Sequence, residues 1–264
     1  ALELEDVYRA SNGSGRSGWT NLKREAGLIV AEPGTEEEYF SRRFAGLLHV
    51  DDSCRLDAIG SVARDWVEAR QEASKASTTV QMLAYQIDGR YDQKGSAGAF
   101  VDRLHGQQGI ADELRELAAL LQARTTLPAM PLPGMEDTPL VLHASYGIRE
   151  VLTAVGWLTA NRRNPFQAGV LALPARRTEL LFVTLDKSEG YHDRIAYHDY
   201  AISAERFHWQ TQNSAGPDTL AGRRYLHSAP EGWKYQLFVR VRKGDVYRAC
   251  GPVLMESAEG DRPM

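Results

Sequence analysis

The sequence has few of the features that would assign a compartment or a chemistry. Its 264 residues include two cysteines, Cys54 and Cys250, which lie far apart, so neither a disulfide framework nor a cysteine-based metal site is expected. We interpret them as buried, reduced thiols of a cytoplasmic protein. No apolar run approaches the roughly 18 residues of a membrane span, and no signal peptide is visible at the N-terminus. No membrane partner is therefore expected.

Motifs of common enzyme chemistry are also lacking. The sequence has no dinucleotide-binding Gly-x-Gly-x-x-Gly in a strand-turn-helix context and no Gly-x-x-x-x-Gly-Lys-Ser/Thr loop. It has no Gly-x-Ser-x-Gly elbow and no His-Glu-x-x-His zinc motif. We therefore expect no cofactor and no catalytic activity in this chain by itself.

Two weaker catalytic possibilities stay open. Glu179, Asp186 and Lys187 have the residue types of a metal-dependent nuclease, but Asp186 and Lys187 are adjacent and would point to opposite faces of a strand. His192 and His198, each followed by an aspartate, would share a strand face and could hold a metal. A solvated polar loop is the simpler interpretation of the histidines.

The charges of the chain are unevenly distributed. The apolar fraction of 43% and the charged fraction of 25% are those of a globular protein. Of the net charge of −4, residues from Thr138 onward contribute +3 (16 Lys+Arg against 13 Asp+Glu), and the preceding residues −7 (15 against 22). A basic half within an acidic chain indicates a polyanionic partner, with a mixed solvated surface as the alternative.

The first half has the apolar period of α-helices. In its clearest helix Leu114, Leu117 and Leu121 form one stripe, and Arg124 lies in the last turn. Helices are predicted at 3–10, 19–27, from Thr35, 53–69, 77–87, 96–105 and 110–124. Four prolines and a glycine in 127–139 cannot continue a helix. We therefore predict a helical domain (1–126), a Pro-rich linker (127–139) and a β-rich domain (140–264).

The second half changes to the period of β-strands. In 235–242, Leu237 and Val239 alternate with Phe238 and Arg240, and Lys243-Gly-Asp245 is typical of a hairpin turn. Further strands are predicted at 140–142, 169–173, 179–185, 194–202 and 246–253, with a helix at 146–160. The fold class is α+β: a helical region, then a mixed, mainly antiparallel curved sheet or barrel with one or two helices.

One segment of the second half concentrates residues suited to nucleic acid. Rings that can stack on a base are Tyr200, Phe207 and Trp209. Groups that can read a base edge are His208, Gln210 and Gln212. Arginines for the phosphates are Arg206, Arg223 and Arg224. In the alternative interpretation, Phe207 and Trp209 are core residues, and His208 and Gln210 face water.

Several of these stretches resemble one family. The segments that carry the resemblance are 178–189, 197–203, 207–212, 251–253, 259–264, Leu142–Tyr146 with Arg149-Glu150, and, more weakly, 19–28 and 48–52. They are similar to a domain of unknown function found C-terminally in bacterial superfamily II (DEAD/DEAH-type) helicases of restriction and DNA-defence systems. The family usually continues past the position of Met264, so the resemblance implies that the chain is cut there.

The resemblance implies DNA as the partner, together with helicase or nuclease domains in the same or another chain. By analogy it implies a barrel of the SRA/PUA class that reads modified or flipped bases. It adds Tyr146 and Arg149 to the expected DNA-binding residues. The alternative function is a protein-interaction or scaffolding module that docks a helicase motor, and a metal-dependent nuclease is a more distant one.

Overall fold

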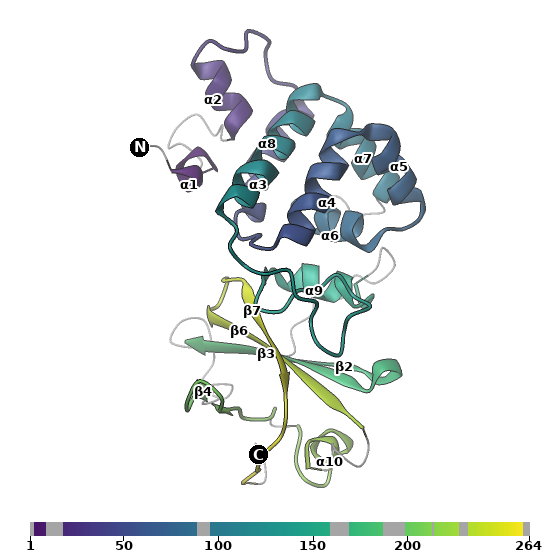
Figure 1. Cartoon of the computed structure of the whole chain (residues 1–264), viewed down its shortest axis with the longest axis vertical. Helices are drawn as coiled ribbons and strands as arrows, with labels where there is room; N and C mark the ends of the chain where they lie inside the picture. The colour runs from purple at the N-terminus through teal and green to yellow at the C-terminus, as the bar shows by residue number, and fades with distance from the viewer. Residues whose placement is uncertain are drawn as a thin grey trace. The chain divides into compact units, whose positions relative to one another are not determined.

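The structure, a computed structural model, divides into two compact units (Figure 1). It describes residues 3–8, 18–88, 96–158, 169–186, 199–212, 214–226 and 232–260. The helical unit comprises Ala1–Pro131 and Asp137–Asn164, and the sheet unit comprises Leu132–Glu136 and Pro165–Met264. The predicted order, helices first and a sheet afterwards, is confirmed.

The helical unit is built almost entirely from helices. Its elements are α1 (Leu4–Tyr8), α2 (Trp19–Glu25), α3 (Thr35–Phe44), η1 (Ala45–Leu47), α4 (Ser53–Arg64), α5 (Trp66–Ser74), α6 (Thr78–Ile87), α7 (Ala97–His105), α8 (Gln108–Arg124), the short strand β1 (Ser145–Tyr146) and α9 (Ile148–Ala154). The α8 stripe is buried as predicted, with Leu114 fully inaccessible. None of the helices in the described ranges is long and apolar enough to cross a membrane.

The helix predicted at 53–69 is two helices. Asp65 ends α4 in an extended conformation, and its carboxylate accepts hydrogen bonds from the amides of Val67 and Glu68. It is thus the N-cap of α5. The new helix axis turns Trp66 away from the α4 stripe, so its side chain is 49% exposed. Trp66 instead donates a hydrogen bond to Asp102 at 3.0 Å.

The sheet unit contains a mixed sheet and a small hairpin. Its elements are β2 (Val170–Leu173), η3 (Pro174–Arg176), β3 (Thr178–Asp186), β4 (Tyr200–Ala201), β5 (Phe207–His208), α10 (Leu220–Leu226), β6 (Lys234–Arg242) and β7 (Tyr247–Val253). Within this unit the strands run in the order β7-β6-β3-β2. The β3–β6 pair is parallel, and β2 and β7 pair with it antiparallel.

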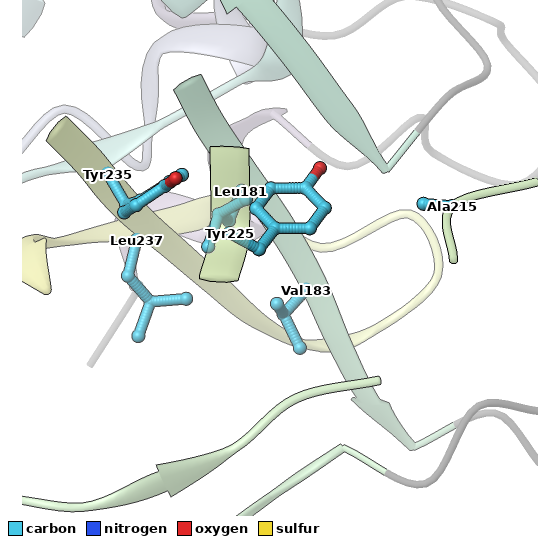
Figure 2. Packing of buried hydrophobic residues seen from close by; sticks show 6 residues of the cluster. All are labelled: Leu181, Val183, Ala215, Tyr225, Tyr235 and Leu237. Carbon is cyan, nitrogen blue, oxygen red and sulfur yellow. The ribbon is translucent and has the colours of Figure 1, made fainter. Parts of the chain in front are cut away.

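The described strands do not close into a barrel, so that part of the prediction is wrong. A parallel pair needs a long crossover, and the one from β3 to β6 carries β4, β5 and α10. The hairpin β4–β5 forms its own two-stranded sheet instead of extending the main one. In β6, residues 235–238 are all buried, so both faces of the strand are covered there. On one face, Leu237 joins Leu181, Val183, Tyr225 and Tyr235 in one apolar cluster (Figure 2).

The boundary between the units differs from the predicted linker. Within 127–139, Leu132 and Met135 are buried, and residues 132–136 belong to the sheet unit. There the side-chain amide of Gln236 donates a hydrogen bond to the carbonyl of Pro133 at 2.7 Å. Residues 137–164 belong to the helical unit, because buried ion pairs described below join residues 145–150 to α4.

The two cysteines are unpaired, as predicted, but both are exposed, so their predicted burial is wrong. Cys54 is the second residue of α4, whose buried residues begin with Arg55 and Leu56. Cys250 lies on β7, whose residues alternate between buried and exposed positions, and it occupies an exposed one.

Candidate nucleic-acid interface

The segment that the sequence analysis expects to contact nucleic acid begins with a hairpin. Tyr200 pairs with His208, and Ala201 with Phe207. The turn is closed by the amide of Ile202, which donates to the carbonyl of Arg206 at 2.9 Å. Successive side chains of a strand point to opposite sides, so His208 faces away from Phe207 and Trp209. The hairpin therefore has one side built around Tyr200 and His208 and another built around Phe207 and Trp209.

The side with Tyr200 and His208 is a pair of stacked rings. Their centroids are 4.7 Å apart, and the ring planes differ by 12°. Tyr200 is 51% exposed and His208 is half-buried. Two nearly parallel rings on an accessible strand pair form a flat aromatic surface of the kind on which a further ring can stack.

Phe207 and Trp209 pack against the core of the sheet unit. Both are half-buried against the cluster that contains Leu181 and Tyr225. The Trp209 ring meets the Tyr225 ring edge to face, with centroids 5.2 Å apart and an interplanar angle of 88°. Phe207 and Trp209 therefore pack as core residues, as the alternative interpretation expected, and are not open rings on which a base could stack.

This difference between neighbouring residues predicts that their replacement changes stability by different amounts. Trp209→Ala is expected to lower the free energy of unfolding by roughly 2 kcal/mol, less than for a fully buried tryptophan because the ring is half-buried. His208→Ala is expected to change it by no more than about 0.5 kcal/mol. Urea denaturation of both variants measures this. A Trp209→Ala protein as stable as the parent would contradict the core assignment.

Backbone hydrogen bonds and an ion pair hold the rest of the segment. The backbone amide of Gln210 donates to the carboxylate of Asp199 at 2.9 Å, and the backbone carbonyl of Gln212 accepts from the backbone amide of Ala215 at 2.8 Å. Arg206 forms an ion pair with Glu256 at 2.9 Å, and both side chains are more than 60% exposed. An exposed pair of this kind contributes little stability, so Arg206 can exchange Glu256 for another anion at small cost.

The two consecutive arginines on α10 have different environments. Arg223 is exposed. The guanidinium of Arg224 instead donates to the carboxylate of Glu179, which is fully buried on β3, and lies over the Trp233 ring at 4.7 Å. Burial and the neighbouring Glu179 carboxylate raise the pKa of Tyr225. The charge of Arg224 is thus engaged within the fold, and its expected role as a phosphate contact stays a prediction.

Tyr146 and Arg149 lie in the helical unit. The Tyr146 ring is fully buried, its hydroxyl accepts a hydrogen bond from the amide of Val141 at 2.7 Å, and the Arg55 guanidinium lies 3.9 Å from its centroid. Burial raises the pKa of its hydroxyl. Tyr146 cannot contact DNA in this structure, so that prediction is wrong. Arg149 is an exposed residue of α9.

The environment of Tyr146 is a network of buried charges that the sequence did not reveal. Arg55, 3% exposed, donates hydrogen bonds to Asp52, to Glu150 at 2.9 Å and to the carbonyl of Ser145 at 2.7 Å. His49 contacts the other oxygen of Glu150 at 2.6 Å. Burial raises the pKa of Glu150, but the Arg55 charge, followed by the hydrogen bond to His49, outweighs it and holds that pKa below its ordinary value.

The same network contains the residues that carried the family resemblance in this part of the chain. The Glu150 carboxylate accepts from the Gly147 amide at 2.7 Å, and the Ser145 amide donates to Asp51 at 2.8 Å. Residues 145–150 are therefore fixed to α4. This position is decided by pairing of charges and not by an apolar period.

Comparison with known proteins identifies one region of the chain. Residues 140–255 match the family described as a domain of unknown function, DUF3427. The match covers less than half of the 264 residues. No curated protein and no solved structure matches the chain. The DUF3427 region begins in the helical unit and continues through the strands of the sheet unit to β7.

The DUF3427 region contains the acids of the nuclease hypothesis, but they are far apart. Glu179 and Asp186 lie near opposite ends of β3, which separates them by roughly 20 Å at the rise of a strand. Glu179 is bound to Arg224, and Asp186 lies 3.5 Å from Arg242. Within the described ranges, no three histidine, cysteine or acidic residues are grouped as a metal site. His192, His198 and Lys187 lie outside those ranges.

Proposed function

We propose that the sheet unit is a DNA-recognition module that binds an unpaired base on the Tyr200–His208 pair. The observation that carries this proposal is the stacked, accessible pair of rings at 4.7 Å on the β4–β5 hairpin. A base adds to such a platform through its π-face, and each base–aromatic stack contributes roughly 1–3 kcal/mol. Bases inside a duplex are already stacked, so the platform suits a single strand or a flipped base.

The neighbouring polar groups support a contact to the rest of the nucleotide. Arg206 at the turn of the hairpin can exchange Glu256 for a phosphate. The side chains of His208, Gln210 and Gln212 offer donors and acceptors to a base edge, and a preference for a modified base would depend on them. We also propose, from the sequence resemblance, that this module belongs to a cytoplasmic bacterial defence protein and works with helicase or nuclease domains.

Removing the platform ring is the direct test. Tyr200→Ala is expected to weaken binding of a fluorescent single strand of roughly 16 nucleotides by about 1–3 kcal/mol, measured by anisotropy. Tyr200→Phe keeps the ring and is expected to bind like the parent. Ile202→Ala is the matched control, because it removes exposed apolar surface from the same hairpin without removing a ring.

Equal binding by Tyr200→Ala and the parent, with both proteins folded, would contradict the platform. If the parent binds neither plain nor modified DNA at low salt, the interaction module becomes the better proposal. One observation favours it. Trp66 and Val67 are 49% and 56% exposed at a hollow of the helical unit that Arg70 also lines, and exposed apolar groups of this kind suit a protein partner.

A further inference from the structure

The parallel pairing of β3 and β6 brings basic residues from separate parts of the chain together. Both strands begin at the same edge of the sheet, where Thr178 pairs with Lys234. The amide of Lys234 donates to the carbonyl of Arg177 at 2.9 Å, and Arg176 precedes Arg177 in the tight turn before β3. Lys234 is far from Arg176 and Arg177 in the sequence, and only the parallel pairing of the two strands brings it to them.

The last turn of α10 adds to the same edge. The ion pair between Arg224 and Glu179 fixes this turn against the second residue of β3, and Arg223 is the preceding residue of the same turn. We call Arg176, Arg177, Arg223 and Lys234 the basic edge. All four side chains are exposed.

Two acidic residues lie beside the basic edge. Glu179 neutralises Arg224, which is not counted in the basic edge. Glu136 lies in the adjoining loop, where its carboxylate accepts from the amide of Gly134 at 2.7 Å, and Gly134 lies beside the Lys234 side chain.

Arg177 occupies a backbone conformation that does not favour arginine. Its φ of 47° and ψ of 45° are left-handed, a region that glycine and asparagine adopt at lower cost. Its amide donates to the carbonyl of Pro174 at 3.1 Å. The turn would therefore form as well or better with asparagine at this position. Charge and turn geometry can be separated experimentally at this residue.

We propose that the basic edge binds the phosphodiester backbone of the nucleic acid whose base stacks on the hairpin. The four charges come from three elements along one sheet edge, which suits successive phosphates of a strand. This inference rests on the proposed function for the identity of the ligand. It concerns different residues, and their contribution to the binding free energy is electrostatic. Backbone contacts act through charge and depend on salt, whereas ring stacking contributes mainly a salt-independent term.

The test compares charge removal at the two ends of the β3–β6 pair. Arg177→Asn and Lys234→Gln remove one charge each from the basic edge, where both strands begin. Arg242→Gln is the matched control, because Arg242 is 74% exposed at the other end of the strand, 3.5 Å from Asp186. Binding of the full chain to a thymidine single strand and to a duplex is measured by anisotropy over a range of salt concentrations, with thermal unfolding as the check on folding.

Each basic-edge variant is expected to weaken binding about fivefold to tenfold. Each should also reduce the slope of log K against log salt by about 0.7 on the single strand or about 0.9 on the duplex. Arg242→Gln is expected to leave both unchanged. The nucleic acid with the larger loss of slope identifies the form that the edge holds. Arg177→Asn should unfold at or above the temperature of the parent.

The outcomes separate this inference from the hairpin proposal. If the basic-edge variants bind like the parent at every salt concentration, the basic edge is not a backbone site, even where Tyr200→Ala loses affinity. If they weaken binding with a lower slope and Tyr200→Ala has no effect, the edge stands and the platform fails. Equal losses in Arg242→Gln would also overturn the inference, because the effect would then come from net charge alone.

Discussion

Replacing Arg55 with methionine is expected to lower the free energy of unfolding of the helical unit by roughly 3–5 kcal/mol. Arg55 is 3% exposed and is the counter-charge for both Asp52 and Glu150, whose side chains are also buried. Methionine has a similar length but leaves two carboxylates in a site with little water. For a unit of this size, that loss corresponds to a fall of roughly 10 °C in the unfolding temperature.

Arg115→Met is the matched control for this substitution. Arg115 pairs with Asp112 at 2.9 Å on α8, but its side chain is 51% exposed. Exposed pairs contribute roughly 0–1 kcal/mol, so thermal unfolding of this variant should resemble that of the parent. Similar, small losses in the two variants would show that the buried network does not hold residues 145–150 on α4.

The same network predicts how the stability of the helical unit changes in acid. The pKa of Glu150 is lower in the folded protein than its ordinary value of 4.5, so the unfolded chain binds more protons in acid. The stability from this group is complete above the ordinary value and is lost as the pH falls through the lower, folded value. A Glu150→Gln variant should lack this part of the acid dependence. An unchanged pH profile of unfolding would contradict the assignment.

The helices were predictable because their signal is local. The α8 stripe of Leu114, Leu117 and Leu121 follows from a period of 3.6 residues, and all three side chains are buried. The same signal failed at Trp66, because the stripe continues past Asp65 although the helix does not. A capping aspartate within an apolar period was the available sign of a break. The buried pair of Arg55 and Glu150 had no such sign, since the two residues lie 95 positions apart in the sequence.

The candidate site was predictable as a segment but not in its orientation. Alternation shows that His208 faces away from Phe207 and Trp209, yet it does not show which side faces the core. Arg176 and Lys234 were not predicted at all, because the parallel pairing that places them together is a property of topology. Glu179 offered a usable sign: it directly precedes the apolar run of residues 180–183 in β3, and a buried acid needs a partner.

Arg224 and Arg223 are adjacent, but their replacements are expected to have unlike effects. Arg224→Met leaves the fully buried Glu179 without its cation, so we expect a loss of roughly 3–5 kcal/mol in the stability of the sheet unit. Arg223→Met removes an exposed charge and should leave stability unchanged within about 0.5 kcal/mol. Hydrogen exchange of amides in 178–186 and 234–242, read by mass spectrometry, measures the sheet unit separately from the helical unit.

A double variant tests whether the loss arises from the uncompensated acid. Replacing a buried ion pair by apolar side chains of similar size is often neutral or stabilising. Adding Glu179→Leu to Arg224→Met should therefore restore most of the protection that Arg224→Met removes. If the double variant is no more stable than the single one, the role of Arg224 is its contact with Trp233, 4.7 Å away, and not its charge. Restored protection would show that the loss in Arg224→Met arises from the uncompensated charge of the buried Glu179.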